Sequence, residues 1–114
     1  MSVDQNTLAH FTGSEGLYKC ARWNVTDGVK YLIDNGAAWI CDVVFSYQAE
    51  RKVRLEPFQS WTFTCDLEKQ TCDVLATDGN DTRLAKQHVP YTDLTVSEIK
   101  LYLVDGVLML SSEY

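Results

Sequence analysis

LYLVDGVLML, at residues 101–110, is the stretch of sequence that decides the fold expected for this chain. Its central Asp105 and Gly106 favour a two-residue type I′ turn, because both turn residues need positive φ angles. Thr95 and Glu98 could instead cap a helix that runs into the same residues. The Asp-Gly pair and the β-forming residues after it agree with each other, so we predict two antiparallel strands here.

Alternating patterns extend this sheet back toward the middle of the chain. From Phe58 onward, Trp61, Phe63 and Cys65 alternate with polar residues, which is the period of a half-buried strand. A turn at 67–70, a return strand, a turn at 78–81 and a third strand at 83–91 follow. With the final hairpin, these runs predict an antiparallel sheet of about five strands.

The first half of the chain has helical signals. Ser2 and Gln5 form a capping box for a short helix, and apolar residues at positions 29, 32 and 33 predict a second one that ends at Asn35 and Gly36. The segment 17–25 is ambiguous. We therefore predict a single α+β domain over residues 1–114, with two or three N-terminal helices packed on the C-terminal sheet.

The run AWICDVVFSYQ, at 38–48, fits two periods. Its aromatic and aliphatic residues recur every four positions, as in a helix, and also at every second position, as in a strand. The run 37–48 is almost wholly apolar and spans twelve residues, which is long for a strand, so we predict a buried helix whose polar stripe is Asp42, Ser46 and Glu50.

Charge and composition limit the kinds of partner. The 114 residues have 16 acidic and 10 basic side chains, a formal charge of −6, which would repel phosphate polymers, so a nucleic-acid partner is not expected. The dense basic stretch Arg51, Lys52 and Arg54 is interpreted as the solvated end of a helix. The sequence shows no signal peptide and no membrane span, and we expect a cytoplasmic protein that does not bind membranes.

The four cysteines allow more than one interpretation. In a cytoplasmic protein they are typically reduced and buried. Cys65 and Cys72 stand apart, because they flank a predicted hairpin turn at positions that could face each other, so a redox or disulfide pair stays open. Neither histidine has ligand spacing to a cysteine, and we expect no metal site and no cofactor.

Five stretches resemble a known family: FTGSE at 11–15, TDGVKYL at 26–32, AWICDVVFSYQ at 38–48, PYTDL at 90–94 and the ending LYLVDGVLMLSSEY. Together they are similar to a family of short, uncharacterised bacterial proteins that are often found on plasmids and in phages. The resemblance runs nearly end to end and implies a compact bacterial cytoplasmic domain. It implies no activity and no catalytic or binding residue.

Candidate site residues come from their surroundings. Asp42 lies among apolar residues that would raise its pKa if it faced inward, although the helical stripe turns it toward water. Tyr91, Thr92 and Asp93 follow a predicted strand, where loops often present functional groups. Trp23 would indicate an interface if it were exposed.

Hydrolase and nucleotide-binding signatures are absent from the sequence, so no catalytic residue is predicted. The leading hypothesis is a small binding or regulatory protein of a bacterial mobile element that acts through protein contacts. A small enzyme or metabolite-binding domain, with Asp42 or Asp93 in a cleft between helices and sheet, is the alternative. Mimicry of DNA is a third hypothesis, which the interspersed basic residues weaken. The last strand, 107–110, could offer an edge for a homodimer.

Overall fold

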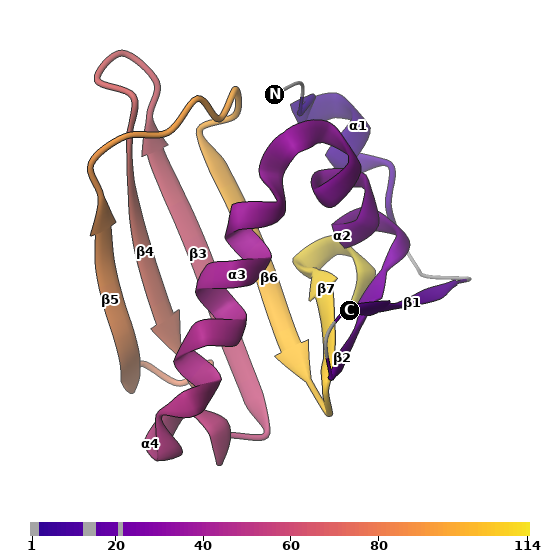
Figure 1. Cartoon of the computed structure of the whole chain (residues 1–114), viewed down its shortest axis with the longest axis vertical. Helices are drawn as coiled ribbons and strands as arrows, with labels where there is room; N and C mark the ends of the chain where they lie inside the picture. The colour runs from indigo at the N-terminus through magenta and orange to yellow at the C-terminus, as the bar shows by residue number, and fades with distance from the viewer. Residues whose placement is uncertain (1–2, 13–15, 21) are drawn as a thin grey trace.

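The computed structural model describes residues 3–12, 16–20 and 22–114, and a seven-stranded sheet dominates this part of the chain (Figure 1). The strands lie in the order β1-β2-β7-β6-β3-β4-β5. Their bounds are β1 (Leu17–Cys20), β2 (Trp23–Thr26), β3 (Phe58–Asp66), β4 (Thr71–Thr77), β5 (Arg83–Val89), β6 (Glu98–Val104) and β7 (Val107–Leu110).

The helices lie over one face of this sheet, and Figure 1 shows α3 crossing in front of β6 and β3. Their bounds are α1 (Gln5–Ala9), α2 (Asp27–Leu32), α3 (Ala38–Ser46) and α4 (Arg51–Arg54), with a π-helical turn at Ile33–Ala37 and 3-10 turns at Tyr47–Ala49 and Ser111–Glu113. Gly36 has a φ angle of 89°, a left-handed conformation that glycine adopts without a steric penalty. The predicted break at this glycine is therefore the kink between α2 and α3.

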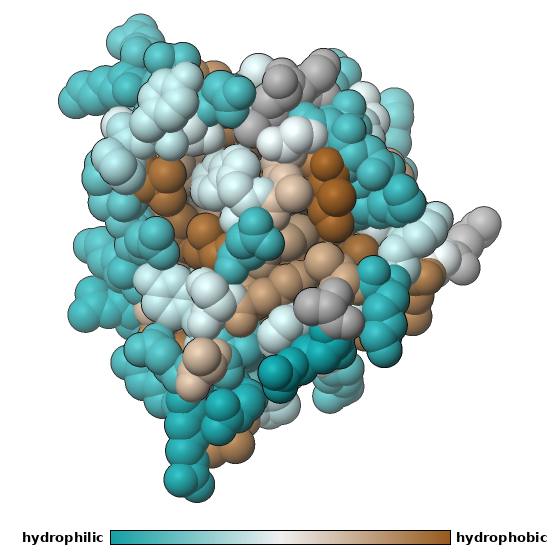
Figure 2. All heavy atoms as spheres, viewed as in Figure 1, coloured by the Kyte–Doolittle hydropathy of each residue, from teal (hydrophilic) through white to brown (hydrophobic). Residues whose placement is uncertain are grey.

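The core fills the space between α3 and the central strands. Trp61 and Phe63 of β3 are fully buried, as are Ile40 and Val44 of α3. Apolar residues gather in the middle of the helix-covered face, and polar residues surround them (Figure 2). The period-two pattern of β3 and the helical period of 38–48 thus meet in one core, which confirms the predicted helix.

The predicted hairpin at the end of the chain is present. Val104 pairs with Val107, and the turn residues Asp105 and Gly106 have φ angles of 50° and 79°. Positive φ at both positions is the type I′ requirement that the sequence indicated.

The predicted arrangement of helices before a five-stranded antiparallel sheet is wrong. Two strands, β1 and β2, precede the main helices and pair with each other, and β2 then pairs in parallel with β7, so the sheet is mixed. β1 and β2 have four residues each, which is too few to show a period of alternating polar and apolar residues. The segment 17–25 is ambiguous in sequence for this reason. A parallel pair between distant segments also leaves no turn signal in the sequence.

The predicted free edge at β7 is wrong for the same reason. Val25 of β2 pairs with Leu108, so both sides of β7 are occupied, and β1 and β5 form the two ends of the described sheet. Homodimer formation through an exposed β7 edge therefore loses its structural basis.

Asp4 is the cap of α1. Its carboxylate accepts a hydrogen bond from the Asn6 backbone N–H at 3.1 Å. The predicted cap, Ser2, lies outside the described residues, as do three residues of the 11–15 motif. No helix within the described ranges combines the length and the apolar character needed to cross a membrane.

The turn after β4 is built around Asp78. Its Oδ1 accepts a hydrogen bond from the Asn80 backbone N–H at 2.8 Å, and its own backbone N–H donates to the Thr82 carbonyl at 3.1 Å. The bond from Asn80 is the main reason that the pKa of Asp78 lies below its ordinary value. The carboxylate form of Asp78 therefore stabilises the turn.

Glu113 joins the end of the chain to the start of α2. Its carboxylate accepts hydrogen bonds from the Thr26 hydroxyl at 2.6 Å, the Gly28 backbone N–H at 3.1 Å and the Leu110 backbone N–H at 3.0 Å. A Cβ atom at Gly28 would lie 2.5 Å from a Glu113 carboxylate oxygen. A glycine is thus required where the carboxylate approaches the helix backbone.

Candidate functional site

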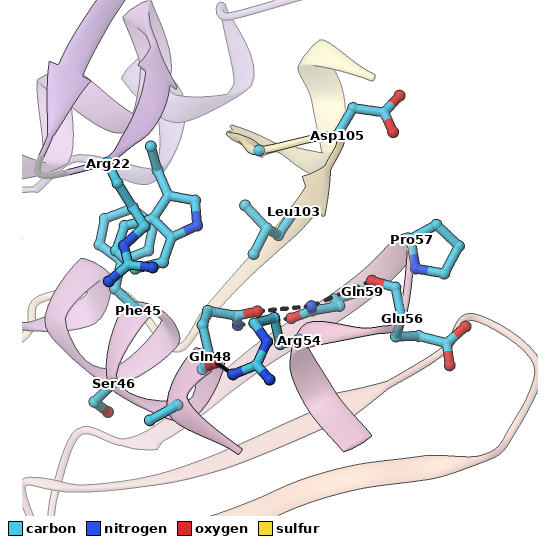
Figure 3. Close-up of a pocket in the computed structure, with 13 residues that line it drawn as sticks. Arg22, Phe45, Ser46, Gln48, Arg54, Glu56, Pro57, Gln59, Leu103 and Asp105 are labelled. Carbon is cyan, nitrogen blue, oxygen red and sulfur yellow. Dashed lines mark hydrogen bonds between the residues drawn. The ribbon is translucent and has the colours of Figure 1, made fainter. Parts of the chain in front are cut away.

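A pocket of about 500 Å³ opens at the end of α3, beside the β6–β7 turn (Figure 3). Its lining comes from four separate parts of the chain, within 22–23, 45–49, 54–59 and 103–106. The volume is within the range of sites that hold a small molecule or an anchoring side chain. We therefore treat this pocket as the candidate site.

Two stacked rings form one wall. Trp23, the first residue of β2, stacks on Phe45 of α3 with ring centroids 4.4 Å apart and planes 3° from parallel. The guanidinium carbon of Arg22 lies 5.4 Å from the centroid of the Trp23 ring, within cation–π range. Both rings are half-buried, so this wall presents flat apolar surface to the pocket.

A pair of buried amides lies opposite. Gln48 and Gln59, which are 6% and 2% exposed, each donate a hydrogen bond to the other's side-chain oxygen at 2.9 Å. The remaining amide N–H groups donate to the carbonyls of Val44 and Val53, and the Trp61 indole N–H donates to the Gln59 oxygen at 3.0 Å. These bonds hold both amides in one orientation.

The charged groups are two arginines and two acids. Within the described residues, neither Arg22 nor Arg54 forms an ion pair, and the Arg54 guanidinium donates a hydrogen bond to the Gln48 carbonyl at 3.4 Å. Figure 3 shows the carboxylates of Glu56 and Asp105 directed away from the middle of the pocket. The guanidinium groups are therefore the charges available to a ligand.

Of the residues predicted from sequence, Trp23 lies in the pocket and Asp42 does not. Asp42 is exposed on α3, as its place on the polar stripe indicated. Water therefore solvates the carboxylate, and the apolar neighbours in sequence do not desolvate it.

Tyr91, Thr92 and Asp93 lie in the segment after β5 and outside the pocket. Tyr91 is 67% exposed and Asp93 is exposed as well. Thr92 is buried, its backbone N–H donates to the Gln70 carbonyl at 2.8 Å, and its hydroxyl accepts from the Leu94 N–H at 3.1 Å. Thr92 therefore anchors this segment to the β3–β4 turn.

Sequence reasoning missed Gln48, Gln59 and both arginines of the pocket. A signal existed for Gln59. It lies two residues before Trp61 and four before Phe63 in β3, so its side chain is on the same face of the strand and points into the core. A polar residue at a core-facing position must find a buried partner. For Arg54, the interpretation as a solvated helix end placed it correctly on the surface and overlooked the neighbouring pocket.

Within the described lining, the potentially reactive side chains are one serine and two carboxylates. Ser46 is the hydroxyl residue in the described lining, and its hydroxyl donates to the Val43 carbonyl at 2.8 Å. No histidine or cysteine of the described chain lines the pocket to act as its base. The described residues also hold no cluster of three or more metal-ligating side chains. The arrangement can stack a flat group and bind a negative charge.

Comparison with known proteins gives a family. Neither the curated proteins nor the solved structures contain a match to the chain. A model of one protein family, described as a family of unknown function (DUF6876), matches residues 3–114. That match covers the pocket, the sheet and the helices alike, so the chain belongs to the family of unknown function DUF6876.

Proposed function

We propose that this protein is a small cytoplasmic binding protein of a bacterial mobile element, and that it binds a partner protein through the pocket beside Trp23. The sequence resemblance supports the cellular setting. The single observation that supports binding is the pocket itself, in which a stacked aromatic wall lies beside two guanidinium groups that have no carboxylate partner among the described residues.

The pocket chemistry defines the segment that it would bind. The Trp23–Phe45 wall offers apolar contact for one side chain, and Arg22 and Arg54 offer donors for a carboxylate. The whole chain has a charge of −6, so a run of acidic residues would be repelled before it arrived. The partner therefore presents an aromatic side chain next to one carboxylate.

Titration with N-acetyl-phenylalanine, which carries a ring and one carboxylate, tests this proposal. We expect saturable shifts in the NMR signals of the Trp23 indole N–H and the Gln48 and Gln59 side-chain amides. The neutral amide of the same compound should bind more weakly. Equal shifts with both compounds would refute the role of the arginines. No shifts at millimolar concentration would refute the role of the pocket.

A matched pair of variants separates the pocket from general charge. Arg54→Gln should weaken binding about twofold to fivefold, the range expected when one exposed charge pair is lost. Arg51→Gln removes the same charge from α4 at an exposed position that does not line the pocket, and should leave binding unchanged. If both variants weaken binding equally, long-range charge and not the pocket is responsible.

The alternative is a small enzyme or metabolite-binding domain in the same cleft. Its catalytic version required Asp42 or Asp93 in the pocket, and both are exposed elsewhere. A metabolite-binding domain would use the same pocket chemistry as proposed above. Acetylated peptides that end in phenylalanine distinguish a metabolite from a protein partner. Tighter binding as the peptide lengthens indicates a protein partner, whereas no gain over the single amino acid indicates a metabolite.

A further inference from the structure

Cys65 and Cys72 face each other in the sheet. They are directly opposite in the antiparallel pairing of β3 with β4, one pair in from the Asp66↔Thr71 pair beside the turn. Cys65 is 7% exposed and Cys72 is 1% exposed. The register therefore places two thiols side by side in the core, as their spacing around the turn indicated.

The hydrogen-bond pattern makes this pair the closer of the two kinds found in antiparallel sheets. The Cys65 backbone N–H donates to the Ser97 carbonyl at 2.7 Å, on the side of β3 away from β4. Cys65 and Cys72 thus form a non-hydrogen-bonded pair, for which the Cα atoms are about 4.5 Å apart. Disulfides span Cα separations of about 4.4 to 6.8 Å, so the backbone needs no rearrangement to accept one.

The thiols also interact with each other. A hydrogen bond from the Cys72 thiol lowers the pKa of Cys65, and the same bond, together with burial, raises the pKa of Cys72. Burial raises the pKa of Cys41 to about 12, so that thiol has little thiolate to react. Cys65 is also the more exposed thiol of the pair, so we assign it the attack on an oxidant and assign Cys72 the resolution of the product.

We propose that Cys65 and Cys72 are an oxidation site that closes to a reversible disulfide when the protein meets a peroxide. The Cys65 thiolate attacks one oxygen of hydrogen peroxide, the O–O bond breaks, and sulfenic acid and hydroxide form. The Cys72 sulfur then attacks the Cys65 sulfur, the S–O bond breaks, and the hydroxyl leaves as water with the Cys72 proton. The hydroxide takes up the proton that Cys65 lost on ionisation, so two thiols and one peroxide give one disulfide and two waters, with both electrons passing to the peroxide oxygens.

The pocket residue Gln59 lies near one end of β3, whereas the disulfide would act near the other end of this strand, beside the turn. Two backbone bonds tie the segment after β5 to this end, one from Thr92 to Gln70 and one from Cys65 to Ser97. A covalent bond between β3 and β4 would constrain Cys65 itself and both strands beside the turn that contains Gln70. The proposal of an oxidation site does not rest on the binding function proposed above.

Tryptic mapping of the folded protein tests the proposal. Lys69 lies between the two cysteines, so trypsin separates them into different peptides unless a disulfide joins them. After treatment with hydrogen peroxide and alkylation of the remaining thiols, we expect the two peptides to run as one species that dithiothreitol splits. Separate peptides without reductant, or a cross-link that involves Cys20 or Cys41, would overturn the proposal.

Two variants test the order of events. In Cys72→Ser, Cys65 should keep its sulfenic acid, and dimedone should label it, because no resolving thiol is present. In Cys41→Ser, the cross-link should form to the same extent as in the original chain. The reciprocal variant is Cys65→Ser. If dimedone labels Cys72 in that variant more strongly than it labels Cys65 in Cys72→Ser, the assigned roles are reversed. Failure of both single variants to be labelled would refute the sulfenic acid step.

Discussion

Replacement of Gln59 by methionine should be one of the most destabilising single changes near the pocket. Methionine is close to glutamine in length but cannot form the bonds that Gln59 makes with Gln48, the Val53 carbonyl and the Trp61 indole. Three buried polar groups would lose a partner, each at a cost of about 1 to 3 kcal/mol. Allowing for relaxation and for the more apolar side chain, we expect the free energy of unfolding to fall by about 3 to 6 kcal/mol.

Urea unfolding, followed by tryptophan fluorescence, measures this loss. Most small domains have a free energy of unfolding of about 5 to 15 kcal/mol, so the predicted change is a large fraction of the total. Gln5→Met is the matched control, because Gln5 is exposed on α1 and its side chain is not buried in a network as Gln59 is. The control should stay within about 0.5 kcal/mol of the original chain.

A double-mutant cycle decides whether the amide pair is the cause. Gln48→Met alone should also destabilise the protein, and the double variant should cost less than the sum of the two single changes by about 1 to 3 kcal/mol. That saving arises because each single variant leaves the other amide without its partner. Additive costs, or a Gln59→Met variant no less stable than the Gln5→Met control, would refute the reasoning.

Three other changes have defined outcomes. Gly28→Ala should displace the Glu113 carboxylate and lower the free energy of unfolding by about 1 to 3 kcal/mol. Thermal unfolding should show that Glu113→Ala costs a similar amount, and that the double variant is little less stable than either single variant. Gly106→Ala should cost about 1 to 2 kcal/mol through backbone strain, because its φ is 79° and, apart from its chain neighbours, no atom of the described residues lies within 4 Å of the new Cβ. Asp105→Asn should be nearly neutral in the same urea assay. Asp78 has a lowered pKa in the folded state, so its contribution to stability is present above the ordinary value of 3.8 and is lost as the pH falls through the folded value. The difference in melting temperature between the original chain and Asp78→Asn should shrink across that acid range, and a constant difference would exclude the carboxylate as the cause.

Local patterns in the sequence predicted the parts of the fold that depend on neighbours in the chain. The alternation from Phe58 gave β3 and its partner, and the pair Asp105 and Gly106 gave the last hairpin. The run 38–48 was harder, because both periods fit it, and its length decided correctly for a helix. In each case the information lay within about a dozen residues.

The pocket could not be predicted because it depends on a pairing that no local pattern encodes. β2 lies parallel to β7, and the Asn24 backbone N–H donates to the Gly106 carbonyl at 3.0 Å across that junction. This bond brings Trp23 to the β6–β7 turn, beside the stacked ring of Phe45. Without the pairing, the two rings would belong to unrelated segments.

The error in the predicted fold and the failure to find the site therefore have one cause. With β7 as a free edge, Trp23 is only an isolated aromatic residue, and the sequence points instead to Asp42, for its apolar neighbours, and to Asp93, for its place after a strand. The parallel strand occupies that edge and carries Trp23 to the pocket in the same step. Changes that weaken the β2–β7 junction should consequently impair stability and ligand binding together, whereas changes in the amide pair that preserve the junction should act first on stability.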